Sequence, residues 1–80
     1  MAELKIFPNP ASGWLVATLP AASGDILSII DYNGKQLLQK RLVNNSNQVT
    51  LDIRALPGGI YRLLWSGDKQ STGRIFVIQR

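Results

Sequence analysis

The sequence contains no histidine and no cysteine. It therefore cannot form Ser-His-Asp or Cys-His catalytic sites, zinc fingers or iron–sulfur clusters. Disulfides are excluded too, so stability must come from packing. Uninterrupted apolar runs reach four residues, as at Ile75–Ile78, which is far too short to cross a bilayer. Residues Met1–Phe7 lack the order of a signal peptide, so we expect a cytosolic chain or a piece of a longer one.

The chain is short, with 80 residues and a mass of 8.8 kDa. This length predicts one small domain. Hydrophobic residues make up 45% of the chain, which allows a core of modest size. A core of that size does not easily leave open a ligand cavity of roughly 300–1,000 Å³. The size and the missing residue types together disfavour an enzyme and predict no metal or other cofactor.

Nine basic residues oppose five acidic ones, which gives a net charge of +4 and a pI near 10. The basic residues are dispersed, and Lys40–Arg41 is the one adjacent pair. Nucleic-acid and lipid-binding surfaces usually concentrate their positive charge. The pattern therefore favours a solvated basic surface, with neither nucleic-acid binding nor membrane insertion expected.

Turn-forming residues recur about every 8–14 positions, which is typical of all-β proteins. They lie at Pro8–Gly13, Pro20–Gly24, Asn33–Gly34, Asn44–Asn47, Pro57–Gly59 and Ser66–Asp68. Between and beside them we predict seven strands, over Leu4–Phe7, Trp14–Leu19, Asp25–Asp31, Lys35–Leu42, Gln48–Ile53, Ile60–Ser66 and Gly73–Gln79.

Alternating polarity predicts which strand faces are buried. Val49, Leu51 and Ile53 share one face of the fifth strand, and Tyr61, Leu63 and Trp65 share one face of the sixth. The opposite face of the sixth strand is only half polar, because Ile60 and Leu64 accompany Arg62. In the second strand, Leu15, Ala17 and Leu19 compete with Trp14, Val16 and Thr18, and the inward set stays open.

Two turns define the expected topology. Asp31-Tyr32-Asn33-Gly34-Lys35 predicts a tight hairpin, since Asn and Gly tolerate the positive φ of primed turns. Leu56–Tyr61 has the pattern of a tyrosine corner, in which a hydroxyl returns to upstream backbone in Greek-key sandwiches. We therefore expect an all-β, immunoglobulin-like antiparallel β-sandwich of about seven strands.

Other chemistry has weak support. Asp31 and Asp52 both end strands, but turn formation explains Asp31 better than a glycosidase carboxylate pair does. Asp31 and Asn33 supply too few oxygens for a calcium site. Strand aromatics, Trp14 among them, are expected in the core, whereas Tyr32 is expected to be exposed at a hairpin tip. Asn44-Asn45-Ser46 matches a glycosylation sequon, which matters only in a secretory pathway.

The order of the motifs is more specific than any one of them. Pro8-Asn9-Pro10 is followed by Asp31 to Lys35, then by Leu56-Pro57-Gly58-Gly59-Ile60-Tyr61, and finally by a basic–apolar strand, Arg74–Arg80. This sequence resembles the type A C-terminal sorting domain of the Por, or type IX, secretion system of Bacteroidota. The resemblance spans residues 6–80.

The resemblance implies that residues 1–80 are a single C-terminal sorting domain, with residues 1–5 a linker remnant and the start of the first strand. Such a domain follows a larger cargo, is recognised by outer-membrane translocon, shuttle and sortase-like components, and is no enzyme. It is typically cleaved off, and the cargo is then released or joined to anionic lipopolysaccharide. The implied destination is the cell surface or the medium, by way of the periplasm.

The resemblance also singles out the residues that stand in the family's motifs. Arg74 and Arg80 stand where the family often has lysine. The candidate recognition residues are Pro8, Asn9, Pro10, Asp31, Gly34, Lys35, Gly59, Tyr61, Arg74 and Arg80.

We further expect Ile75–Ile78 and its basic flanks to dock on the secretion machinery, in part by main-chain pairing at a sheet edge. Two other classes stay open: a fibronectin-like or carbohydrate-binding module of a larger secreted enzyme, and a small basic nucleic-acid-binding barrel.

Overall fold

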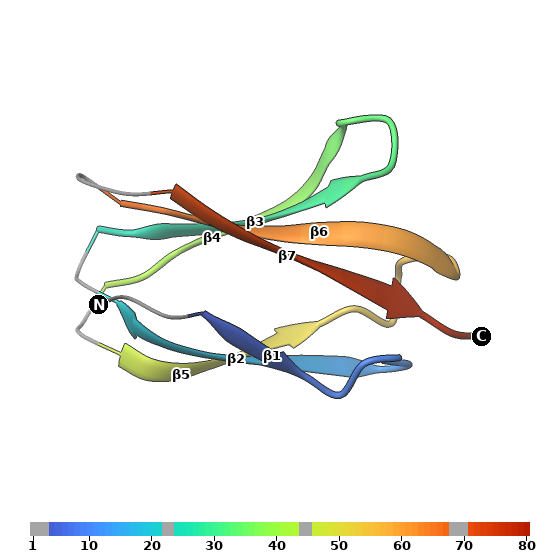
Figure 1. Ribbon diagram of the computed structural model, residues 1–80, viewed down its shortest axis with the longest axis horizontal. Helices are drawn as coiled ribbons and strands as arrows, with labels where there is room; N and C mark the ends of the chain where they lie inside the picture. The colour runs from blue at the N-terminus through green and yellow to red at the C-terminus, as the bar shows by residue number, and fades with distance from the viewer. Residues whose placement is uncertain (1–3, 22–23, 44–45, 68–70) are drawn as a thin grey trace.

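The computed structural model describes residues 4–21, 24–43, 46–67 and 71–80 (Figure 1). Of the predicted linker remnant and strand start at residues 1–5, residues 1–3 lie outside the described residues. Parts of the predicted turns at residues 22–23, 44–45 and 68–70 lie outside them too, as does most of the sequon.

Seven strands form two antiparallel sheets that pack face to face (Figure 1). The three-stranded sheet has the order β1-β2-β5, and the four-stranded sheet has the order β4-β3-β6-β7. The strands are β1 Lys5–Phe7, β2 Trp14–Ala21, β3 Ile26–Asp31, β4 Gln36–Arg41, β5 Ser46–Asp52, β6 Gly59–Ser66 and β7 Ser71–Ile78. The neighbours β2–β5 and β3–β6 are not consecutive, which gives the crossing connections of a Greek key. The expected all-β sandwich is confirmed.

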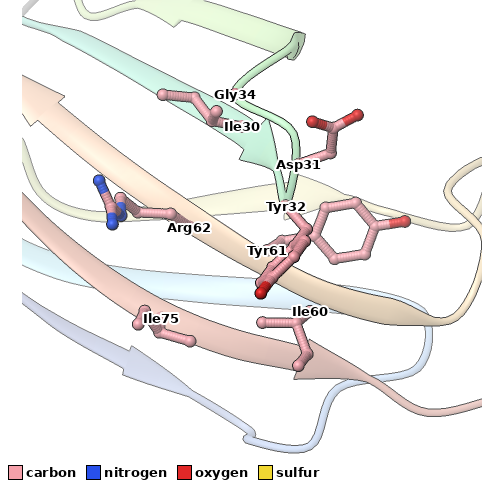
Figure 2. Close-up of a pocket in the computed structure, with 8 residues that line it drawn as sticks. All are labelled: Ile30, Asp31, Tyr32, Gly34, Ile60, Tyr61, Arg62 and Ile75. Carbon is pink, nitrogen blue, oxygen red and sulfur yellow. The ribbon is translucent and has the colours of Figure 1, made fainter.

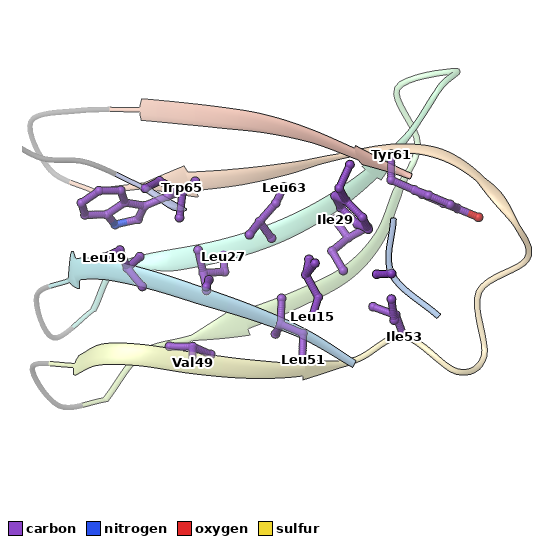
Figure 3. Close-up of a cluster of buried hydrophobic side chains, with 14 of the residues drawn as sticks. Leu15, Leu19, Leu27, Ile29, Val49, Leu51, Ile53, Tyr61, Leu63 and Trp65 are labelled. Carbon is purple, nitrogen blue, oxygen red and sulfur yellow. The ribbon is translucent and has the colours of Figure 1, made fainter. Parts of the chain in front are cut away.

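The core lies between the two sheets, and every second side chain along a strand points into it (Figure 3). Tyr61, Leu63 and Trp65 of β6 point inward, opposite Val49 and Leu51 of β5. Trp65 is fully buried, and its indole Nε1 donates a hydrogen bond to Asp25 Oδ2 at 2.9 Å. The largest side chains therefore fill the space between the layers, as expected for β5 and β6.

The second strand resolves the choice that its sequence left open. Leu15, Ala17 and Leu19 are buried, and the register places Leu15 opposite Leu51 and Ala17 opposite Val49. Trp14 consequently points outward and is 48% exposed, so its expected place in the core was wrong. The physical reason is pairing: β2 must present its apolar set on the face where β5 presents its own.

The hairpin between β3 and β4 is confirmed, but its predicted primed turn is wrong. The type I′ turn that Asn-Gly favours needs positive φ at both residues, whereas Gly34 has φ of 89° and Asn33 does not have positive φ. Gly34 N donates to Asp31 O at 3.0 Å, and Asp31 N donates to Lys35 O at 2.9 Å. This is a three-residue loop that ends in a left-handed glycine, a common alternative to the two-residue turn.

Candidate functional site

The opening motif lies beside the last strand. Asn9 Oδ1 accepts a hydrogen bond from Val77 N at 3.1 Å. Ala11 N donates to Val77 O and Gln79 N donates to Ala11 O, both at 2.8 Å, so Ala11 pairs in parallel with Ile78. The bonds before Pro8 and Pro10 are cis. The segment after β1 thus leaves the three-stranded sheet and covers the end of β7.

This arrangement changes how β7 can be recognised. Strand β7 is the edge of the four-stranded sheet, as expected for a docking strand. At Val77, however, both main-chain groups are already bonded, the N–H to Asn9 and the carbonyl to Ala11. A partner strand could pair here only by displacing residues 9–11. The side chains of Ile75 and Val77 instead point away from the core.

The two candidate arginines bond to main-chain carbonyls. Arg74 Nε donates to Leu4 O at 2.9 Å, which joins β7 to the chain just before β1 in the other sheet. Arg80 Nη2 donates to Ile53 O and to Leu56 O, both at 2.7 Å, and Nη1 bonds to Ser12 O. A guanidinium carries five donors in a fixed planar arrangement, which suits several carbonyls at once. Both arginines therefore tie separate segments of the sandwich together.

The tyrosine corner is present. Tyr61 Oη donates to Pro57 O at 2.5 Å, and its ring lies 5.8 Å from that of Phe76. The sequence singled out Gly59 here, but Gly58 makes the closer approach. A Cβ on Gly58 would lie 3.2 Å from both Ile78 O and Arg80 Cγ. Gly58 therefore lets the corner pack against the end of the chain, and only its place in a double glycine marked it.

The hairpin motif is also held internally. Asp31 Oδ1 accepts bonds from Asn33 N at 2.9 Å and Lys35 N at 2.8 Å. Asp31 thus acts as a turn former, as the sequence indicated. In the described part of the chain no cluster of three or more Asp, Glu, His or Cys residues could hold a metal. The candidate calcium site therefore gains no support from the structure.

The four motifs converge on one end of the sandwich. Strand register places Asp31 opposite Tyr61 and Gly59 opposite Ile78. Asn9 bonds to Val77, and Arg80 bonds to the carbonyl just before Pro57. Most of the sequence-predicted residues therefore meet at one end, although Arg74 lies farther along β7.

A shallow groove of about 240 Å³ opens at this end, on the outer face of the four-stranded sheet (Figure 2). Its lining comes from the hairpin and from strands β3, β6 and β7, and comprises Ile30, Asp31, Tyr32, Gly34, Ile60, Tyr61, Arg62 and Ile75. Ile60 and Ile75 are 52% and 61% exposed. The sequence motifs had named Asp31, Gly34, Tyr61 and the segment Ile75–Ile78, but not Ile30, Ile60 or Arg62. The one signal was the half-polar outer face of the sixth strand.

On the outer face of the three-stranded sheet, Asp52, Arg54 and Trp14 interact with one another. Arg54 Nε and Nη2 donate to Asp52 Oδ1 and Oδ2 at 3.0 and 2.8 Å, and Arg54 Cζ lies 4.9 Å from the centroid of the Trp14 ring. Hydrogen bonds from Arg54 lower the pKa of Asp52 to about 2. Since Arg54 lies over the indole, a sugar could stack on that face of Trp14 only by displacing Arg54.

Comparison with known proteins identifies the family. The described residues contain no helix long and apolar enough to span a membrane. A search of curated proteins gave no match. The family of secretion system C-terminal sorting domains matches residues 5–79, nearly the whole chain. The chain thus belongs to this family, whose members are C-terminal sorting signals for the type IX secretion system, interact with its machinery and are generally non-catalytic.

Proposed function

We propose that the machinery recognises the folded domain, and that the motif residues act mainly by building it. The observation that carries this proposal is that five of them use polar side-chain groups within the chain. Asn9, Asp31, Tyr61, Arg74 and Arg80 each bond to a main-chain group. A short linear signal would instead need these groups to be available to a partner.

The proposal includes the finer steps that the family resemblance implies. Residues 1–80 act as one sorting domain behind a cargo, which reaches the periplasm first. Outer-membrane translocon, shuttle and sortase-like components then handle the domain. A peptidase removes it, and the cargo is released or joined to anionic lipopolysaccharide. The domain itself performs no catalysis. The carbohydrate-binding alternative is not favoured, because Arg54 lies over one face of Trp14.

An export assay tests this proposal. A periplasm-targeted fluorescent protein is fused in front of the 80 residues and produced in a bacterium with a type IX system and in a strain that lacks the translocon. We expect fluorescence on the surface or in the medium only when the translocon is present, with the domain cleaved off. Fluorescence that stays in the periplasm of both strains, with the domain folded, contradicts the proposal.

Motif variants separate shape from direct contact. Arg80→Lys keeps the charge but loses the planar donor arrangement, and Asn9→Ala removes the acceptor for Val77 N. We expect the export of both variants to follow the fraction of folded domain, measured by resistance to proteolysis. A variant that is fully folded yet not exported would show that its side chain contacts the machinery directly.

A further inference from the structure

The outer face of the four-stranded sheet has an unusual composition around Arg62. We call the surface formed by Ile30, Ile60, Arg62, Ile75 and Val77 the Arg62 face. Register places Arg62 between Ile30 on β3 and Ile75 on β7, and Ile60 opposite Val77. Solvated faces of antiparallel sheets are normally polar. Here isoleucine and valine side chains surround one cation, and a group of exposed apolar side chains marks an interaction site.

The Arg62 side chain is supported by the sheet. A Cβ on Gly73 would lie 3.2 Å from Arg62 Cδ and 3.5 Å from Arg62 Cγ. Because Gly73 has no side chain, the aliphatic part of the Arg62 side chain can pack against the backbone of strand β7 at this position. Support of this kind reduces the conformational entropy that the side chain loses when it binds.

The guanidinium of Arg62 has no acidic partner in the described part of the chain. Asp31 lines the same groove, but its Oδ1 bonds to the hairpin backbone and its carboxylate points away from Arg62 (Figure 2). On the side of the other sheet, by contrast, the guanidinium of Arg54 donates two hydrogen bonds to the carboxylate of Asp52. Arg62 thus presents free donors among apolar side chains, an arrangement complementary to a carboxylate with aliphatic neighbours.

The groove constrains the form of the partner. Its volume of about 240 Å³ is below the range of about 300–1,000 Å³ usual for small-molecule sites. It suits one or two side chains of an extended segment. Nucleic acids and anionic lipid surfaces are held by several cations, whereas this face has Arg62 at its centre. A second copy would bring another Arg62 toward the same face.

From charge and shape together we infer that the Arg62 face docks an extended segment of a partner protein, in which one Asp or Glu is flanked by aliphatic side chains. The carboxylate pairs with Arg62, and the aliphatic neighbours cover Ile60 and Ile75. This inference rests on the proposed function, since the partner is then a component of the secretion machinery. It locates the recognition on the Arg62 face and assigns it to a carboxylate–arginine pair with apolar neighbours.

A peptide-binding experiment with the 80-residue chain tests the chemistry directly. The probes are two capped pentapeptides, Thr-Val-Glu-Val-Thr and its Gln twin, followed by amide chemical shifts in nuclear magnetic resonance. We expect shifts centred on Ile60, Arg62 and Ile75, and about tenfold weaker binding of the Gln peptide because the charge-assisted bond is lost. Arg62→Gln should abolish the difference between the peptides, while the matched variant Arg54→Gln should preserve it.

Three results would overturn the inference: equal binding of the two peptides, shifts elsewhere on the domain, or shifts at Ile75 that depend only on protein concentration. The last would mean that a second copy covers the face. In the export assay we expect Arg62→Glu to lower export about tenfold and Arg54→Gln to change it less than about twofold. If wild-type cargo is not exported, the proposed function fails. If wild type and Arg62→Glu are exported equally, only this inference fails.

Discussion

Strand β6 has two faces that serve different purposes. Its inner face carries Tyr61, Leu63 and Trp65, which fill the space between the sheets. Its outer face carries Ile60, Arg62 and Leu64, and Ile60 lies half open to solvent. Adjacent residues of one strand therefore differ in what their loss would do. Inner substitutions should act through stability, whereas outer substitutions should act through recognition on an intact fold.

The largest effect is expected at the centre of the inner face. Leu63 is fully buried, so Leu63→Ala removes packed methyl groups and leaves a cavity. We expect the free energy of unfolding to fall by about 2–5 kcal/mol. Chemical denaturation of the two proteins measures this difference. The matched outer variant, Ile60→Ala, should lose much less stability, and an equal loss from both would contradict the proposed division.

A smaller inner effect is expected at the tyrosine corner. Tyr61→Phe keeps the ring that stacks on Phe76 but removes the hydroxyl bonded to Pro57 O. We expect the unfolding free energy to fall by about 0.5–1.5 kcal/mol, the usual net value of one hydrogen bond. Thermal unfolding of the two proteins provides the measurement. No change would mean that solvent replaces this bond fully.

The outer face should show the reverse pattern. Ile75 is 61% exposed, so Ile75→Thr keeps the β-branched shape suited to a strand while reducing apolar surface. We expect the unfolding free energy to change by no more than about 0.5 kcal/mol. Export of the fused cargo should nevertheless fall. Undiminished export from a fully folded Ile75→Thr domain would argue against recognition on this face.

The smallest effect concerns the two exposed arginines, Arg62 and Arg54. The pKa of Asp52 is lowered to about 2 by Arg54, so the folded state binds this proton less readily than the unfolded chain. The stability that Asp52 contributes is present above about pH 4 and is lost as the pH falls toward about 2. We expect Asp52→Asn to flatten the fall in melting temperature in this window. Arg62→Gln should leave it unchanged.

A carboxyl titration of Asp52 by nuclear magnetic resonance checks the same point independently. A midpoint near 2 is expected in the wild-type domain, and a higher midpoint is expected in Arg54→Gln, which loses the ion pair but keeps the bond from the main-chain N of residue 54 to Asp52 Oδ1. A wild-type midpoint near 4 would show that the ion pair does not persist in solution.

The sequence predicted most of the fold because turn residues and alternation are local signals. The strands, the hairpin and the tyrosine corner follow from them. The orientation of Trp14 did not, because both faces of its strand are largely apolar and only pairing with β5 selects between them. The turn at Asn33 was misjudged because Asn tolerates positive φ without requiring it.

The candidate site was less predictable, since it depends on contacts between distant segments. The motifs named Asn9, Arg74 and Arg80, but not the carbonyl and amide groups that they meet across the sandwich. The sequence named Ile75 and Val77 of the Arg62 face as part of a docking strand, but it did not bring them together with Ile60 and Arg62. A period of two shows that Ile60 and Arg62 share a face, but not whether another layer covers it.

The link between the opening motif and β7 has a consequence for folding kinetics. It joins Asn9 with Val77, which are 68 positions apart, and the nearby bond from Arg74 to Leu4 spans 70. Forming such contacts requires closing most of the chain into one loop, and β-sandwiches of this kind fold in milliseconds to seconds. The six earlier strands cannot complete the structure by themselves. The folded shape that we propose is recognised therefore exists only after the seventh strand has joined. Recognition of that shape would thus select domains that are complete and fully folded.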